Sequence, residues 1–380
     1  MLPRLLLSLL VLGSGILAPA RDQLALLGTY TGNAAPDSRG IYAVKLNSET
    51  GALSTPELVA ELPNPEFLAL HPNGRVVYAL TRMDTPGHKD GAAVAAFALE
   101  PGNGRLTLLN RQPADGASLT HLAVDATGRM LVAASYGGGY VVSFPLAPDG
   151  RLGAHSTWLN ETGPLGPVRD RQNAPHPHSV TLSPDNRFAF VADLGVDRVF
   201  SYALDPVHGT VALNEAGGIR IEPGAGPRHT RFSPDGKSFY VLDELDGTIT
   251  ACRYDDIQGV AEPFQRVSTS ADDYHGRNSC SEIRVHPTGR FVYAANRGHN
   301  GIAVFARDQV TGILNRVEIM PTGGQNPRNF SLTPDGAWLL CGHQDSGQLT
   351  VFQVDATTGR LTATAHTAAV AKAVCVLFLP

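Results

Sequence analysis

A short turn-and-strand pattern recurs six times along the chain and constrains its fold more than any other feature. The pattern is a turn of the type His-Pro-Asn-Gly, or a variant of it, followed by an apolar strand. Its fourth turn position falls at Gly74, Gly128, Asn186, Gly236, Gly289 and Gly336, with spacings of 54, 58, 50, 53 and 47 residues. Glycine or asparagine there supplies the left-handed backbone that a tight hairpin needs. A third and a fourth strand follow each turn, which gives four strands per unit.

The two ends of the chain supply a seventh unit between them. Residues 24–60 contain strands two to four of the pattern without a first strand, and the segment from Ala373 reads as a lone first strand. Pairing these ends closes a ring that has no exposed edge. Even repeats of four strands, without helical periodicity, are typical of propellers. The sequence therefore predicts an all-β fold, a seven-bladed β-propeller with four antiparallel strands per blade, closed by the N- and C-terminal strands.

The N-terminal residues have the layout of a secretory signal peptide. Arg4 precedes an apolar run over residues 5–17, and Ala18-Pro19-Ala20 forms a small-x-small cleavage site. The run is too short to span a bilayer, so the mature protein is expected to have no membrane contact. The predicted organisation is a signal peptide over residues 1–20 and a single propeller domain over residues 21–380, located in the periplasm or secreted.

Composition excludes several classes of function. The formal net charge is −5, and no cluster of basic residues interleaved with aromatic ones occurs, which argues against nucleic-acid binding. Cys252, Cys341 and Cys375 lie within apolar strand patterns, so buried free thiols are expected there. No cysteine has the spacing of a zinc site, and we predict neither a metal nor a cofactor. The sequence leaves the oligomeric state open.

Polar side chains gather just before the first strand or just after the second strand of several units. These segments form the loops at one end of a propeller's channel, where function is usually carried. The candidates are Arg171, His176, His178, Arg228, His229, Glu244, Arg297, Arg328 and Asn329. Guanidinium groups bind carboxylate or phosphate and stabilise oxyanions, while histidine and glutamate transfer protons. Neither a G-x-S-x-G elbow nor an H-E-x-x-H motif occurs, so a serine hydrolase and that zinc site are not supported. The same residues are also compatible with a non-catalytic role, in which polar side chains at the end of the channel bind a ligand or hydrogen-bond between neighbouring blades.

Several longer motifs carry a family resemblance that spans nearly the whole mature chain. They include RQNAPHPHSV from Arg171, GAGPRHTRFSPDG from Gly224, SEIRVHPTGRFVYAANRGHNGIAVF from Ser281 and GGQNPRNFSLTPDG from Gly323. In this order they resemble the seven-bladed lactonase family, typified by propeller-type 6-phosphogluconolactonases and the related fungal carboxymuconate cyclases. The resemblance implies a hydrolase that opens a sugar lactone. The alternatives are a cyclase-like isomerase and a non-catalytic propeller that binds a ligand or protein.

The resemblance also suggests roles for the candidate residues. It implies a catalytic set of His178, Arg228, Glu244 and Arg297, with Arg171, His176, His229, Arg328 and Asn329 as substrate-binding residues. Glu244 would activate water and His178 would protonate the leaving oxygen, or the reverse. Two departures bear on substrate fit, because Asp243 and His343 stand where the family usually has asparagine. The expected partner is a small lactone.

Overall fold

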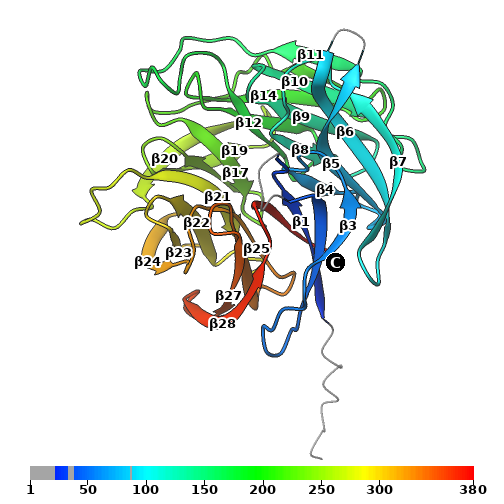
Figure 1. Ribbon diagram of the computed structural model, residues 1–380. Coiled ribbons are helices and arrows are strands. Elements are labelled where there is room, and N and C mark those ends of the chain that lie inside the picture. The colour runs from blue at the N-terminus through cyan, green and yellow to red at the C-terminus, as the bar shows by residue number, and fades with distance from the viewer. Residues whose placement is uncertain (1–21, 33–37, 86–87) are drawn as a thin grey trace, which may run out of the picture.

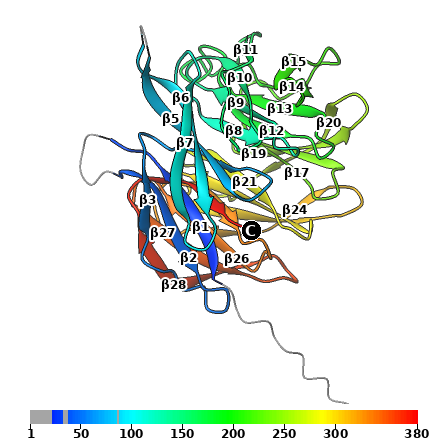
Figure 2. The same cartoon turned by 90° about the vertical axis from the view of Figure 1, so that its right-hand side faces the viewer.

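The described residues form seven four-stranded antiparallel sheets arranged as a ring (Figures 1 and 2). The structure is a computed structural model that describes residues 22–32, 38–85 and 88–380. All its named elements are strands. The predicted signal peptide lies outside the described residues. In the described part of the chain, no helix is long and apolar enough to cross a membrane.

We number the blades along the chain, and their strands are as follows. Blade 1 contains β29 (Ala373–Phe378), β1 (Gln23–Thr29), β2 (Gly40–Leu46) and β3 (Glu57–Glu61). Blade 2 contains β4 (Leu68–Leu70), β5 (Val76–Thr85), β6 (His88–Glu100) and β7 (Arg105–Pro113). Blade 3 contains β8 (His121–Val124), β9 (Met130–Ser135), β10 (Tyr140–Pro145) and β11 (Thr157–Asn160). Blade 4 contains β12 (Pro177–Leu182), β13 (Phe188–Asp193), β14 (Arg198–Asp205) and β15 (Thr210–Leu213), and β16 (Ile219–Arg220) also pairs with β14.

The remaining three blades follow the same order. Blade 5 contains β17 (Pro227–Phe232), β18 (Ser238–Asp243), β19 (Thr248–Asp255) and β20 (Val260–Ser268). Blade 6 contains β21 (Ser279–Val285), β22 (Phe291–Arg297), β23 (Gly301–Arg307) and β24 (Leu314–Pro321). Blade 7 contains β25 (Pro327–Leu332), β26 (Trp338–His343), β27 (Gln348–Val354) and β28 (Leu361–Ala369). The first strands of successive blades contact one another, so they form the inner wall of the ring.

The ring closes as predicted, by pairing of the chain ends in blade 1. Strand β29 is antiparallel to β1, with Leu27 opposite Val376 and Gly28 opposite Cys375. Figure 1 shows the red C-terminal strand beside the blue β1. This pairing joins β29 to a strand that lies some 350 residues away along the chain. It gives blade 1 the four-stranded arrangement of the other blades.

Apolar packing between the blades, with a recurring set of hydrogen bonds, holds the ring together. The hydroxyls of Tyr78, Tyr240 and Tyr293 donate to the carbonyls of Gly150, Gly312 and Gly359 in the following blade, at 2.8–2.9 Å. The turn histidines serve the same purpose, since Nε2 of His71 lies 3.0 Å from the Gly128 carbonyl oxygen. Gly128 has a positive φ of 69°, and a Cβ there would lie 2.3 Å from the His71 ring. Glycine at this turn therefore permits the positive φ and also leaves room for the histidine ring of the neighbouring blade.

Candidate active site

A β-bulge at the start of the first strand aims one side chain of each of three blades into the ring. The strand register shifts between Pro177 and Ser179, between Pro227 and His229, and between Pro327 and Asn329. The residues within these shifts are His178, Arg228 and Arg328. Each stands eight residues before the fourth position of its blade's turn. A bulge redirects the extra residue's side chain, and here it does so at the same depth in each blade.

Three guanidinium groups surround the buried carboxylate of Glu244. Its Oε1 lies 2.6 Å from Nη2 of Arg171, and its Oε2 lies 2.6 Å from Nη1 of Arg228 and 2.9 Å from Nη2 of Arg297. The Glu244 side chain is 2% exposed. Burial alone would raise its pKa, but the guanidinium groups of Arg297 and Arg228 hold the pKa well below its usual range. Glu244 is therefore an ionised anchor for three cations.

Arg228 connects this cluster to His178. Its Nη1 donates to Nε2 of His178, and its Nε donates to the Ser281 carbonyl oxygen at 2.8 Å. Because guanidinium groups only donate, Nε2 of His178 is an acceptor and the ring proton lies on Nδ1, which has no hydrogen-bond partner among the described residues. Burial, with the Arg228 charge, holds the pKa of His178 well below its usual range, so the imidazole is neutral.

A small polar cavity lies at this end of the channel. Its lining residues are Tyr30, Glu66, Phe67, Thr120, His178, Arg228, His229, Arg328, Asn329 and Val374. The space that the centre of a water molecule can occupy in this cavity is about 20 Å³, and the total empty space, which includes open solvent, is about 270 Å³. These side chains come from six of the seven blades, so the cavity exists only in the closed ring. A larger cavity of about 570 Å³ between blades 4 and 5 contains none of the predicted site residues.

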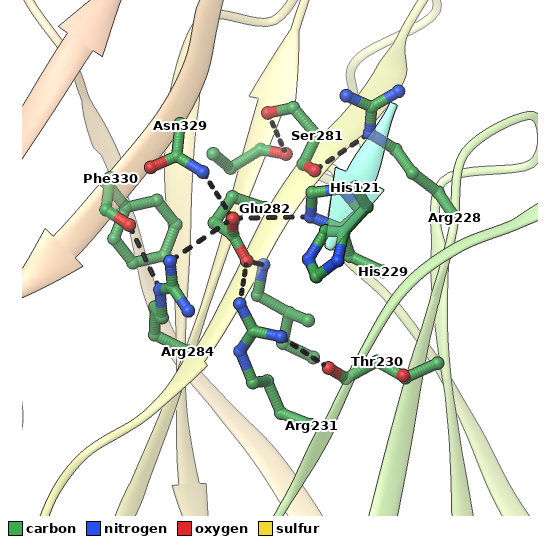
Figure 3. A network of polar contacts seen from close by, with 12 residues as sticks. His121, Arg228, His229, Thr230, Arg231, Ser281, Glu282, Arg284, Asn329 and Phe330 are labelled. Atoms are coloured by element: carbon green, nitrogen blue, oxygen red, sulfur yellow. Dashed lines mark hydrogen bonds and ion pairs between the residues drawn. The ribbon is translucent and has the colours of Figure 1, made fainter. Parts of the chain in front are cut away.

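A second ionic network lies beside the cavity and joins the first strands of blades 5, 6 and 7 (Figure 3). Glu282 on β21 lies 3.3 Å from Nδ1 of His229, 3.2 Å from Nη2 of Arg231 and 3.5 Å from Nη2 of Arg284. It also accepts from the side-chain amide of Asn329. Burial lowers the pKa of His229 to about 4, so its ring is neutral near pH 7. This network fixes the inner strands and presents His229 to the cavity.

Comparison with known proteins agrees with this architecture. The family model for the seven-bladed β-propeller lactonases matches residues 24–378. The chain belongs to this family. A 6-phosphogluconolactonase from Bacillus subtilis is 38% identical over 357 residues, which cover 94% of this chain and 98% of that protein. The structure of a periplasmic gluconolactonase from Pseudomonas aeruginosa is 28% identical with a TM-score of 0.87, and the match covers 95% of this chain and 99% of that one.

In this member of the lactonase propeller family, the four residues of the predicted catalytic set lie in one network. His178 and Arg228 line the cavity directly. Glu244 and Arg297 lie behind Arg228, and Arg297 lines a separate open pocket of about 420 Å³. Their proximity is a finding of the structure, whereas their catalytic roles stay predictions.

The five predicted substrate-binding residues divide into two groups. His229, Arg328 and Asn329 line the cavity, although the Asn329 amide is occupied by Glu282 and by the backbone NH of Val376 at 2.9 Å. Arg171 and His176 do not line it. The His176 ring stacks on Tyr136 with centroids 4.4 Å apart, and its nitrogens bond to the Tyr136 carbonyl and the Asn173 side chain. These contacts indicate that His176 holds its own loop against Tyr136.

The two departures from the usual family sequence also lie outside the cavity lining. One carboxylate oxygen of Asp243 accepts from the hydroxyls of Thr248 and Thr250, at 3.1 and 2.7 Å. The fully buried His343 has Nδ1 3.1 Å from the Gln348 carbonyl oxygen. Both side chains support turns within their own blades.

Sequence reasoning missed part of the cavity wall. Tyr30, Glu66, Phe67 and Thr120 line it beside the predicted residues. A signal was present, because Glu66 and Thr120 stand eight residues before the turn positions Gly74 and Gly128, as His178 and Arg228 do in their own units. Glu66 also follows a proline, as His178, Arg228 and Arg328 do.

Proposed function

We propose that this protein is a lactonase that hydrolyses the ring ester of a sugar lactone. The observation that carries the proposal is the set of three guanidinium ions around the buried Glu244 carboxylate, one of which, Arg228, lines the cavity. Three guanidinium groups and one carboxylate leave a net positive charge, which stabilises an anionic species nearby. Hydrolysis of an ester passes through a tetrahedral intermediate with a negatively charged oxygen. The names of the Bacillus and Pseudomonas relatives support the same class of reaction.

Arg228 is the proposed donor to the developing oxyanion. It is buried, it lines the cavity, and its position is fixed by Glu244 and by the Ser281 carbonyl. A fixed donor needs little reorganisation when charge develops, which is the source of its catalytic effect. Arg297 and Arg171 act through Glu244 and hold it in place.

Arg328 is the proposed contact for an acidic or hydroxyl-bearing substituent. It is partly exposed at the rim, its guanidinium lies 5.3 Å from the Tyr30 ring centroid, and it forms no ion pair with another described residue. A guanidinium group of this kind is free to bind phosphate or carboxylate in a two-pronged manner. Since the centre of a water molecule can occupy only about 20 Å³ of this cavity, we expect Arg328 and the rim to move when a lactone enters.

We further propose that the protein acts in the periplasm or outside the cell. The signal-peptide pattern over residues 1–20 supports export, and the Pseudomonas relative is periplasmic by name. Sugar lactones released by aldose oxidation outside the cytoplasm would be suitable substrates. Sequencing the N-terminus of exported protein is expected to give Arg21, and an intact Met1 on membrane-held active protein would contradict export by cleavage.

The assay that tests the proposed activity uses purified mature protein with aldonolactones, with and without a phosphate group. We expect the hydroxy acid to form faster than in the uncatalysed reaction. The proton that this acid releases is the quantity measured. Comparing the two substrate sets shows whether a phosphate is required. Turnover of a carboxymuconolactone but of no sugar lactone would favour the isomerase alternative, and binding without turnover would favour a non-catalytic propeller.

A further inference from the structure

Glu66 occupies, in blade 2, the position that His178, Arg228 and Arg328 occupy in their own blades. All four follow a proline, all stand eight residues before the turn position, and all line the same cavity. In a ring of seven blades, blade 2 lies across the channel from blades 5 and 6, whose strands β17 and β22 carry Arg228 and Arg297. Glu66 therefore brings a carboxyl group to the side of the cavity that faces the guanidinium cluster.

The surroundings of Glu66 differ from those of the other carboxylates near the channel. Glu244 and Glu282 are each held by several cations, whereas Glu66 forms no ion pair with another described residue. Tyr30 lines the same cavity, and its interaction with Glu66 lowers the pKa of that carboxyl group. The charged or titratable groups that face it are Tyr30 after β1, Arg82 on β5, His178 on β12, Arg228 and His229 on β17 and Arg328 on β25.

We propose that Glu66 is the general base that activates the attacking water in this lactonase, with Tyr30 as its positioning residue. The inference rests on the proposed function. Its geometric basis is a carboxyl group on the wall of the cavity that Arg228, the proposed oxyanion donor, also lines, and this carboxyl group forms no ion pair with another described residue. Burial raises the pKa of Glu66 to about 7, which makes its carboxylate a far stronger base than one at the usual value.

The two earlier candidates are less suited to this step. Both carboxylate oxygens of Glu244 are bound by guanidinium groups, and the low pKa that results makes it a weak base. Nε2 of His178 is occupied by Arg228. Glu66 keeps its carboxylate available to a water molecule in the cavity.

The Glu66 carboxylate takes a proton from water while the water oxygen bonds to the lactone carbonyl carbon, and the carbonyl oxygen becomes an oxyanion opposite Arg228. The tetrahedral intermediate then collapses, the bond from that carbon to the ring oxygen breaks, and protonated Glu66 returns its proton to the leaving oxygen. The product is the open hydroxy acid, which releases one proton to solvent and leaves Glu66 ionised.

The principal test is the variant Glu66→Gln, which keeps the shape of the side chain and removes its basicity. We expect kcat to fall about 100-fold or more, the usual scale of a lost general base, while KM changes by less than about threefold. In the wild type, kcat/KM should fall as the pH drops below about 7, and this acidic limb should disappear in the variant. Glu61→Gln is the matched control, since Glu61 is an exposed residue of blade 1 paired with Arg39, and it should leave the rate unchanged.

Tyr30→Phe supplies a second readout that a purely structural role would not produce. The interaction with the Tyr30 hydroxyl lowers the pKa of Glu66, so removal of this hydroxyl should move the acidic limb of kcat/KM to higher pH. This variant keeps the inference testable even if Glu66→Gln fails to fold, which a thermal melt would show.

The outcomes separate the inference from the function on which it rests. Loss of the rate and of the acidic limb in Glu66→Gln, or the expected shift in Tyr30→Phe, supports the inference. An active wild type whose rate and pH profile survive both substitutions overturns the role of Glu66 and leaves the lactonase function intact. A folded wild type that opens no lactone overturns the function, and the inference with it.

Discussion

At the scale of single residues, Arg228 connects the parts of the site. One side chain donates to the Glu244 carboxylate, to the His178 ring and to the Ser281 carbonyl, and it joins blades 4, 5 and 6 in doing so. A planar guanidinium group with five N–H donors can make all three contacts at once, and an ammonium group cannot reproduce that geometry. The same residue therefore contributes to the rate and to the stability of the ring.

Arg228→Ala should lower kcat/KM by about 100-fold or more, as removal of one oxyanion donor typically does. Arg228→Lys should restore only part of the rate, because a point charge cannot replace the planar fork. Both quantities, the rate per folded molecule and the melting temperature, are to be measured on one preparation. Arg39→Ala is the control, since Arg39 is an exposed arginine of a surface ion pair. A stable Arg228→Ala protein with an unchanged rate would exclude Arg228 from the chemistry.

The raised pKa of Glu66 also predicts a pH-dependent effect on stability. The pKa is about 7 in the folded protein and 4.5 in an ordinary environment, so the folded state binds more protons between these values. The free energy of unfolding then decreases as the pH rises through this window, and it has lost the full contribution of protonated Glu66 once the pH is above about 7. Thermal melts should show that Glu66→Gln is stabilising at about pH 8 and nearly neutral at about pH 4. Equal effects at the two pH values would argue against a raised pKa.

Among the secondary-structure elements, strand β29 both closes the ring and contacts the network beside the cavity. It pairs with β1 on one side, packs against β25, and its Val376 NH donates to the Asn329 side chain at 2.9 Å. Asn329 in turn donates to Glu282. The closing strand is thereby connected to the inner network of blades 6 and 7, which lies beside the cavity.

Deletion of residues 373–380 should abolish cooperative folding. The segment buries several apolar side chains, and each fully buried one contributes roughly 1.5–3 kcal/mol. Their sum is comparable to the whole stability of a typical domain, about 5–15 kcal/mol. Circular dichroism melts would compare the deletion with a control that lacks only the exposed Pro380. A sharp transition near the wild-type temperature in the deletion would show that the ring does not need this closure.

At the scale of the whole molecule, stability comes from packing between blades without covalent cross-links in the described residues. All four cysteines are buried and free, although an exported protein would meet an oxidising environment. Burial raises the pKa of the Cys375 thiol to about 12, which keeps the thiol protonated and unreactive. Similar burial surrounds the other three. The expectation of buried free thiols at Cys252, Cys341 and Cys375 is confirmed.

Thiol titration should therefore detect almost no reactive cysteine in the native protein and four after unfolding in denaturant. The melting temperature should be the same with and without a reducing agent, because no disulfide constrains the unfolded chain. The control is a titration of fully reduced, denatured protein, which fixes the total. Fewer than four thiols in denatured protein that was never reduced would reveal a disulfide and contradict the prediction.

The repeat pattern was sufficient to predict the number of blades, their four-strand plan and the closure by Ala373–Phe378, because an even repeat with one divided unit has one way to leave no open edge. It also identified the segments that carry Arg228 and Glu244 as candidates. Which side chains share a cavity could be seen only in the folded ring. His176 stacks on Tyr136 beside the cavity, while Glu66 and Tyr30, far away in the sequence, line it with His178. Bulges set the direction of the His178, Arg228 and Arg328 side chains, and closure of the ring brings residues that are distant in the sequence to the same cavity.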